Sequence, residues 1–354
     1  MMLKNFKKFT FRALFVGNIL VILLMLLIGN IDWLNPVDYP LLANLGLGYP
    51  ILLVFNFAFL VFWAFVRLRT IWLPVLGFIL CFASIRIYCP FNLPKDKPHG
   101  AIKVLSYNVY MFDSWEETNP KTNPIVNYII DSKADLVCLQ EAQGDGDKSG
   151  GIYERLKAHY PYFKLMVKKK PGADYMVLLS RYPILWQDTI PYGSISNQSV
   201  AYMVDIKGTK TLVVNNHFES NGLSNDDKAG FKSLVKGSMQ TDKAKSESVH
   251  LLRKLGKVSM RRAPQADMVA RYVKQYLDKK VPVILCGDFN DNPLSYTHRV
   301  IDKELIDCFV ASGNGPGISY HRSGMYFRID HIFCSDDFEP YDAHIDNSVT
   351  ASDH

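Results

Sequence analysis

The sequence predicts a layered α/β sandwich preceded by three membrane-spanning helices. Before about residue 90 the chain is almost purely apolar and aromatic, whereas the remainder has the composition of an ordinary soluble domain. In that remainder, apolar β-rich runs alternate with turn clusters and helical patterns. This alternation indicates a mixed sheet core with helices packed outside it.

Three apolar stretches occupy the N-terminal region. They are Phe11 to Ile31, Leu45 to Val66, and Ile71 to about Tyr88. Each is close to the roughly 20 residues that cross the hydrocarbon core of a bilayer. A cleaved signal peptide has a single short apolar region, so it does not fit three successive spans. We therefore expect residues 1–92 to be a multi-pass membrane region with the lipid bilayer as its partner.

The basic residues around these stretches predict their orientation. They precede the first span and follow the second, at Lys4, Lys7, Lys8, Arg12, Arg67 and Arg69. The loop between those spans has no Lys or Arg from Asp32 to Ala43. The positive-inside bias then places the N-terminus in the cytoplasm and the large domain outside, in the periplasm if the membrane is a bacterial inner membrane. Arg86, near the outer end of the third span, opposes this slightly unless it snorkels to the interface.

The prolines and lysines of PFNLPKDKPHG predict a linker over residues 93–101, and residues 102–354 form the soluble domain. The predicted strands are IKVLSYNV, DLVCLQE, YMVLLS, AYMVDI, TLVVNNHF, PVILCGDF and RIDHIF. The predicted helices are Pro124 to Ser132, Gly151 to Ala158 and Ala263 to Leu277. Several strands are continuous apolar runs, as expected for strands buried on both faces.

Polar side chains follow these strands at the positions where a scaffold presents chemistry. They are Asn108, Glu141, His217, Asp288, Asn290, Asp330, Asp353 and His354. Carboxylate and amide oxygens without cysteine suit magnesium or manganese rather than zinc. The six cysteines contain no CxxC pair, and we interpret them as buried free thiols.

The domain resembles the endonuclease/exonuclease/phosphatase superfamily, which includes deoxyribonuclease I, abasic-site endonucleases of the exonuclease III type, bacterial sphingomyelinases and inositol-polyphosphate 5-phosphatases. The similarity covers about Ile102 to His354. It rests on LSYNV, LQE, LLSRYPI, NNHFES, RAPQA, GDFND, RIDHIF and the terminal SDH, all in family order. The resemblance implies a four-layered α/β sandwich with mixed β-sheets, and a metal-dependent phosphoric ester hydrolase that uses Mg²⁺ or Mn²⁺.

The resemblance also implies a role for each metal-site residue. Glu141 corresponds to the principal metal-binding glutamate, and Asn108 to the asparagine beside the metal. Asp353 corresponds to a residue that helps to hold the metal or orient the site. The structural alternatives are an ion-paired glutamate at a strand end and an asparagine in a turn.

Five residues correspond to the family's catalytic groups. Asp288 orients or activates the attacking water, and Asn290 donates to phosphate oxygens. His217 contacts the scissile phosphate. Asp330 and His354 form an acid/base pair, in which the carboxylate fixes the tautomer of the imidazole. The family usually assigns this histidine as the general base, and some members instead use it for electrostatic stabilisation.

Two further features bear on the site. Arg262 and Gln265 lie in RAPQA, which we interpret as structural, with a phosphate contact as the alternative. The family normally continues beyond the SDH motif with a proline and a last strand. We therefore expect the chain to be trimmed after His354.

The favoured function is that of a membrane-anchored phosphodiesterase. Within this class we favour a nuclease, such as an endonuclease. The net charge of +6 and a basic segment from Asn221 to Met260 suit a polyanion such as nucleic acid or an anionic lipid headgroup. The alternatives are a sphingomyelinase-like or inositol-phosphate phosphoesterase, and a non-catalytic binding module on the same fold. The alternative without a functional role is that the basic segment is a helical hairpin whose charges simply face water. The sequence indicates no protein partner.

Overall fold

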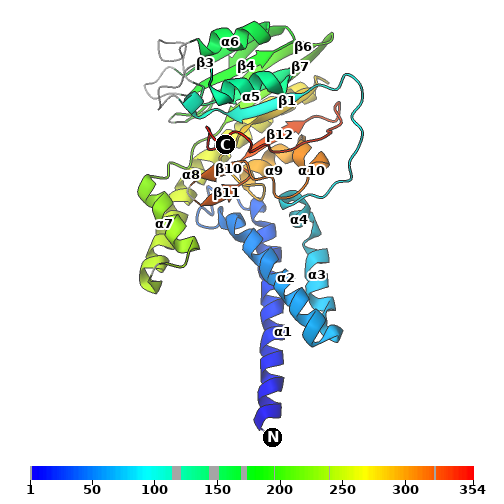
Figure 1. The fold of residues 1–354 in the computed structure, drawn as a ribbon, viewed down its shortest axis with the longest axis vertical. Helices are drawn as coiled ribbons and strands as arrows, with labels where there is room; N and C mark the ends of the chain where they lie inside the picture. Colours follow the sequence, from blue (N-terminus) through cyan, green and yellow to red (C-terminus); the bar gives the residue numbers. More distant parts are fainter. Residues whose placement is uncertain are drawn as a thin grey trace.

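The C-terminal part of the protein is a sandwich of two β-sheets with helices on both outer faces (Figure 1). The computed structural model describes residues 2–113, 121–142, 151–168, 174–194, 196–238, 240–322 and 324–354. Apolar side chains fill one core between the sheets and one under the helices on each side. The layers are therefore helix, sheet, sheet and helix, which confirms the predicted fold class.

The first sheet has four strands in the order β1-β2-β4-β3. Their bounds are Val104–Asn108, Leu136–Gln140, Tyr175–Ser180 and Tyr162–Val167 for β1, β2, β4 and β3. β1 and β2 are parallel, and β4 is antiparallel to both of its neighbours. The helices α5 (Pro124–Ser132) and α6 (Ile152–His159) cover its outer face.

The second sheet has six strands in the order β5-β6-β7-β8-β12-β9. Their bounds, in that order, are Ile184–Thr189, Ser199–Ile206, Thr209–His217, Val283–Asp288, Asp330–Cys334 and Ile306–Asp307. β7 and β8 are parallel, and the other pairs are antiparallel. A separate hairpin consists of β10 (Tyr320–Arg322) and β11 (Met325–Phe327).

The outer helix of the second sheet is α8 (Thr241–Leu277), which is preceded by α7 (Asn225–Val235). Two short helices, α9 (Tyr296–Asp302) and α10 (Cys308–Ser312), complete the domain. The predicted helix over Ala263 to Leu277 is thus only the second half of α8, which continues through Pro264. The strands β3 and β5 were not predicted, because neither is fully buried and neither forms an apolar run.

The N-terminal region contains α1 (Met2–Gly29), α2 (Tyr49–Val66), α3 (Trp72–Leu80) and α4 (Phe82–Tyr88). α1 and α2 are long and apolar enough to cross a membrane. The third predicted span differs from expectation, because α3 and α4 meet at a bend of 62°. It is a third crossing only if this bent pair is one span. Ser84 in α4 donates a hydrogen bond of 2.7 Å from Oγ to the carbonyl oxygen of Gly29 and so ties α4 to the end of α1.

The N-terminal helices are docked against the sandwich domain. The loop between α1 and α2 contacts α9, where Arg299 pairs with Asp32 at 3.4 Å and lies over the Trp33 ring. Asn44 of the same loop donates from Nδ2 to Ser259 Oγ in α8 at 3.1 Å. The domain is thus held by direct contacts as well as by its covalent connection.

The segment predicted as a linker follows the surface of the domain. Just before it, Asn92 donates to the carbonyl oxygens of Val310 and Gly313. Within it, Lys95 pairs with Glu339 at 3.0 Å, and the carbonyl of Gly100 accepts from Lys207.

Candidate active site

Strand register brings the predicted polar residues to one end of the sandwich. Asn108 ends β1 opposite Gln140, the last residue of β2, and Glu141 follows directly. His217 ends β7 directly opposite Asp288, the last residue of the parallel strand β8. Because parallel strands end at the same edge of a sheet, each sheet presents two of these groups together.

The two sheets are aligned by a buried polar bridge next to this edge. Gln140 donates from Nε2 to Asn215 Oδ1 at 2.7 Å, and Asn215 donates from Nδ2 to the carbonyl of Leu139 at 3.0 Å. Buried amides need such partners, so a slip of one sheet over the other would break both bonds. The bridge thereby fixes Glu141 of one sheet beside His217 of the other.

Asn108 connects the carboxylates of the two sheets. Its Nδ2 donates to Glu141 Oε1 at 3.0 Å and to Asp288 Oδ2 at 3.1 Å. Asn108 is buried, whereas about a third of the Glu141 side chain is exposed. Glu141 therefore lies at the mouth of the site, where a cation can reach it.

His217 is held by a residue that the sequence analysis missed. Its Nδ1 lies 2.5 Å from Asp174 Oδ2, and the other carboxylate oxygen of Asp174 accepts from the backbone N–H of Glu141 at 3.0 Å. Burial opposes protonation of the ring, but the charges of Asp174, Asp288 and Glu141 together raise the pKa of His217 to about 9. Asp174 immediately precedes the apolar run YMVLLS, and that position was its only signal in the sequence.

Asp288 lies at the centre of the group. Its Oδ2 is 3.6 Å from the Nε2 atoms of both His217 and His354, and its Oδ1 accepts from the backbone N–H of Asn290 at 2.7 Å. Burial raises the pKa of Asp288 to about 6, against the opposing charge of His354. Asn290 adopts a left-handed backbone conformation with φ of 53°, and its Nδ2 donates to the carbonyl of Phe218.

His354 and Asp330 form the predicted pair, with Nδ1 of the ring 2.8 Å from Asp330 Oδ2. Burial lowers the affinity of the ring for a proton, but the charges of Asp330 and Asp288 outweigh it and raise the pKa of His354 to about 10. The ring packs edge-on against Tyr320. Two hydroxyls that the sequence analysis did not single out position the pair. Ser352 Oγ accepts from the N–H of His354, and Ser319 Oγ accepts from that of Asp330.

Asp353 does not join the other predicted metal ligands. Its Oδ2 lies 3.1 Å from Arg322 NH1 in the β10–β11 hairpin, and its carbonyl oxygen accepts from the N–H of His321. The Arg322 guanidinium also lies over the Tyr110 ring. Asp353 thus fastens the hairpin beside the site instead of turning toward Glu141 and Asn108.

Arg262 and Gln265 support the loops that carry the site, in keeping with the structural interpretation. Arg262 is fully buried, pairs with Asp291 at 3.0 Å and donates to the carbonyl of Glu219. Gln265 accepts from the N–H of Glu219 at 2.9 Å. Arg262 therefore joins the segments that directly follow His217 and Asp288, and Gln265 holds the first of them.

The donor set fits a hard divalent cation. Ligand atoms of Asp288, Asp330 and His354 lie within 4.8 Å of one another, with Glu141 and Asn108 linked to the same group. Among the described residues, the buried Oδ1 of Asp330 has no hydrogen-bond partner. The carboxylates of Glu141, Asp288 and Asp330 gather at one end of the sandwich and repel one another, and a cation relieves that repulsion.

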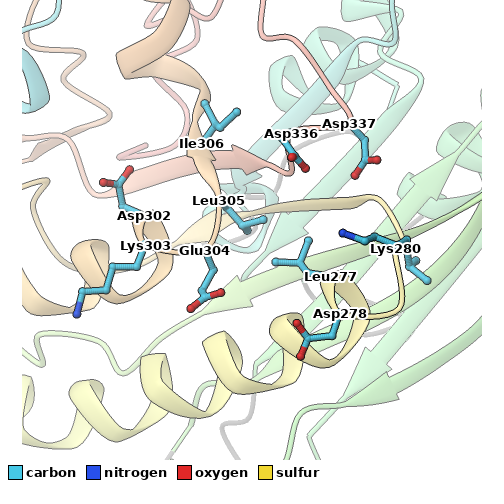
Figure 2. Close-up of a pocket in the computed structure, with 11 residues that line it drawn as sticks. Leu277, Asp278, Lys280, Asp302, Lys303, Glu304, Leu305, Ile306, Asp336 and Asp337 are labelled. Carbon is cyan, nitrogen blue, oxygen red and sulfur yellow. The ribbon is translucent and has the colours of Figure 1, made fainter.

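A surface hollow elsewhere in the domain does not suit a phosphate ester (Figure 2). It has a volume of about 700 Å³ and lies at the opposite end of β8 and β12 from Asp288 and Asp330. Its charged lining residues are Asp278, Lys280, Asp302, Lys303, Glu304, Asp336 and Asp337. An excess of carboxylates repels an anionic substrate, so we place the chemistry at the other end of the strands.

Comparison with known protein families shows to which family this chain belongs. The model of the Endonuclease/Exonuclease/phosphatase family matches residues 105–354. The chain belongs to this family. A second family model, described as a domain of unknown function (DUF8431), matches residues 11–88, the region of the apolar N-terminal helices. A search of curated proteins gave no significant match.

Several solved structures are similar to this endonuclease/exonuclease/phosphatase domain. The human Nocturnin catalytic domain with bound sulfate has 15% identity and a TM-score of 0.48, covering 68% of this chain and 84% of its own. Truncated Caenorhabditis elegans TDP2 has 13% identity, a TM-score of 0.45 and coverages of 68% and 85%. Staphylococcus aureus beta toxin has 16% identity and a TM-score of 0.43, covering 68% of this chain and 87% of its own. Identities this low do not carry a substrate across to this chain.

Proposed function

We propose that this protein is a divalent-metal-dependent phosphodiesterase anchored in a bacterial inner membrane. The observation that carries the proposal is the convergence of two imidazoles on one buried carboxylate, with both Nε2 atoms 3.6 Å from Asp288 Oδ2. Each imidazole has its own carboxylate behind it, Asp174 for His217 and Asp330 for His354. Such an arrangement holds protons at defined atoms and presents positive charge to a phosphate.

The metal would be held by Glu141 with Asn108 beside it, at the exposed mouth of the site. When bound, Mg²⁺ or Mn²⁺ would neutralise charge on the phosphate oxygens. Asp353 would act indirectly, through its contact with Arg322.

The other residues of the site each have a separate role in hydrolysis. The attacking water loses its proton to the Asp288 carboxylate as its oxygen bonds to phosphorus. The bond from phosphorus to the leaving oxygen breaks, and the protonated ring of His354 supplies the proton that this oxygen needs. His217 and the amide of Asn290 stabilise the charge on the phosphate oxygens.

We infer that the substrate is nucleic acid, because the described rim of the site offers aromatic and arginine side chains rather than an apolar surface. Tyr320 packs against His354, and Arg322 of the same hairpin pairs with Asp353 and lies over the Tyr110 ring. Tyr326, opposite His321 in this hairpin, is 59% exposed. Rings and guanidinium planes stack on bases, and arginine also binds backbone phosphate.

A phosphodiester in a lipid headgroup, or an inositol phosphate, is the second candidate. It is favoured by the docking of the domain against the membrane helices, where the Arg299 contacts hold it near the bilayer. A lipid enzyme benefits from such proximity, because its substrate never leaves the membrane surface.

The arrangement of the helices supports an outward-facing domain. α1 ends and α2 begins at the loop docked on the domain, and α4 ends where Arg328 donates to the carbonyl of Ile87. Figure 1 shows the N-terminus at the opposite end of α1. Lys7, Lys8 and Arg12 therefore share the far end of the helices with Arg67 and Arg69, as expected for cytoplasmic loops.

The test is a substrate panel on the full chain in lipid nanodiscs. The panel contains plasmid DNA, single-stranded DNA, RNA, sphingomyelin and inositol phosphates, each with Mg²⁺, Mn²⁺ or a chelator. We expect metal-dependent cleavage of nucleic acid that falls by about 10²–10⁴-fold in Asp288→Asn, because a positioned proton acceptor contributes a factor of that order.

Asp336→Asn is the matched control. This residue lies beyond the other end of β12 in the acidic hollow, so its substitution should leave turnover unchanged. Cleavage of lipid or inositol phosphate alone would transfer the function to the second candidate. A folded protein that binds metal yet turns over nothing would favour a binding module.

A further inference from the structure

The two halves of α8 have different surroundings. From Ala263 onward, Ala266, Val269 and Val273 are buried against the second sheet. Before Gly256, Leu251 is the one buried residue in this fully described half of the helix. The N-terminal half of α8 and α7 thus form a hairpin, described over residues 225–238 and 240–255, that extends beyond the body of the domain.

This hairpin begins at the membrane-proximal surface. An ideal Cβ at Gly256 would lie 2.5 Å from the carbonyl oxygen of Pro40, so the helix backbone touches the loop that joins α1 to α2. Figure 1 shows the hairpin descending from this point on the same side of the domain as the membrane helices. In this view α7 reaches the level of the domain-proximal ends of α1 and α2, where a bilayer crossed by these helices would have its surface.

The exposed charge on the hairpin and on the turn of α8 that follows it is predominantly positive. The exposed basic residues are Lys232, Lys236, Lys243, Lys245, Arg253 and Lys257, and the exposed acidic residues are Asp226 and Asp242. Asp227 is buried at the base of α7, where Lys254 and His250 pair with it. Val235, at the end of α7, is 67% exposed between Lys232 and Lys236.

We propose that the α7–α8 hairpin is a second membrane contact, which binds anionic headgroups of the bilayer that the N-terminal helices cross. Lysines around an exposed valine match an interfacial helix, in which the apolar side chain enters the headgroup region and the ammonium groups meet lipid phosphates. The inference rests on the membrane anchoring proposed above. It is independent of which phosphodiester is the substrate.

Nucleic acid is the competing occupant, and the position of the hairpin argues against it. The basic face lies beside membrane helices, and the hairpin's described exposed side chains include no Phe, Tyr or Trp and only one arginine, Arg253. The aromatic residue of α7, Phe231, is instead packed against Phe327 of β11.

That packing connects the headgroup contact to the active site. β11 pairs with β10, which carries Tyr320 against the ring of His354 and Arg322 against Asp353. Headgroup binding by α7 would therefore hold the rim of the site at a fixed height above the bilayer.

The test uses tryptic cleavage after Lys236 in the full chain. The protein is reconstituted in nanodiscs of phosphatidylcholine alone or of phosphatidylcholine with phosphatidylglycerol. We expect cleavage to be about tenfold slower on the anionic discs, because several lysines near an anionic surface each contribute to binding, and high salt should abolish the difference. Cleavage after Lys133, an exposed residue following α5, is the internal control and should not change.

The triple variant Lys232→Gln, Lys243→Gln and Lys245→Gln keeps Lys236 as the reporter and should lose the protection. Equal cleavage on both kinds of disc would overturn the proposal. Protection by DNA on phosphatidylcholine discs, without an effect of anionic lipid, would assign the surface to nucleic acid instead. Failure of the chain to remain with the discs would refute the anchoring itself, and would be recognised before any protease is added.

Discussion

At the residue scale, Asp330 controls the charge of His354. The carboxylate stabilises the imidazolium and holds the pKa of His354 at about 10, so the ring is protonated at neutral pH. Asp330→Asn keeps an oxygen for Nδ1 but removes the charge, so the pKa should fall. If the protonated ring supplies the proton to the leaving oxygen, the alkaline limb of the pH profile of kcat/KM should move to lower pH.

A nitrogen-15 titration of His354 run beside this rate profile gives an independent reading of the same pKa. Asp336→Asn should leave both curves in place. If the Asp330→Asn variant had lower activity but an unchanged alkaline limb, Asp330 would act only by orienting the His354 ring and not through its charge.

Asp174 offers a second residue-scale prediction. It positions His217 through Nδ1 and Glu141 through the backbone N–H, so one substitution disturbs both partners. Asp174→Asn should lower kcat by about 10–100-fold, as removal of partners behind a functional ligand commonly does. It should also lower the pKa of His217, because the negative charge of Asp174 helps to raise that pKa to about 9.

The measurement is again a histidine titration, combined with the metal concentration needed for half-maximal rate. A changed metal requirement is expected because Glu141 loses a backbone anchor. If the pKa of His217 stayed near 9 in this variant, another group would have to supply the charge.

The site could be predicted where each residue follows its own strand. Asn108, His217 and Asp288 end apolar runs, so their positions along the sequence already reveal their shared edge. Asp174 precedes its strand, and its contacts with Glu141 and His217 are 33 and 43 residues away in sequence. Such a partner becomes visible only when two sheets are stacked.

At the element scale, α8 shows what local rules cannot decide. A proline in a helix interior costs roughly 3 kcal/mol, so sequence reasoning begins the helix near Pro264. In the structure, packing on both sides of the proline offsets this cost. Val269 and Val273 are buried under the sheet, and Gly256 and Ser259 contact the α1–α2 loop. The bend between α3 and α4 is a similar case. Hydropathy predicts how long and how apolar a segment is, but it does not predict the hydrogen bond from Ser84 to Gly29 that sets the direction of α4.

Asp227 governs the stability of the α7–α8 hairpin. It completes a capping box with Ser224 at the start of α7 and pairs with Lys254 and His250 of α8. These partners hold the pKa of its carboxyl below its usual value, so its contribution is present above pH 4 and is lost only in stronger acid. Asp227→Ala should therefore increase hydrogen exchange in α7 at neutral pH by about fivefold or more, the effect of losing roughly 1 kcal/mol of capping.

Asp226→Ala is the matched control, because this neighbouring aspartate is exposed. Its substitution should change exchange in α7 much less. Equal effects of the two substitutions would show that helix-end charge, rather than the Asp227 contacts, stabilises α7.

At the scale of the whole molecule, the contact between Gly256 and Pro40 couples the N-terminal helices to the catalytic domain. Two opposing effects act on Gly256→Ala. Alanine favours the helix by about 1 kcal/mol, but its Cβ would lie 2.5 Å from a backbone oxygen, and displacing packed backbone costs about 1–3 kcal/mol. The atoms that the new Cβ would meet belong to backbone rather than to a flexible side chain. We therefore expect the cost of the clash to exceed the gain in helix propensity, and the α1–α2 loop to separate from α8.

The expected result is a melting temperature lower by a few degrees, the shift that about 1 kcal/mol produces in a domain of this size, together with faster proteolysis of residues 31–48. Gly48→Ala provides the comparison, because an ideal Cβ at Gly48 meets nothing within 4 Å. It should leave both measurements unchanged. If Gly256→Ala instead raised the melting temperature and left the loop protected, helix propensity would have won, and the loop would be free to move away from α8 without loss of stability. The catalytic domain would then be held to the N-terminal helices mainly by the Arg299 contacts, the Arg328 contact with Ile87 and the chain that follows α4.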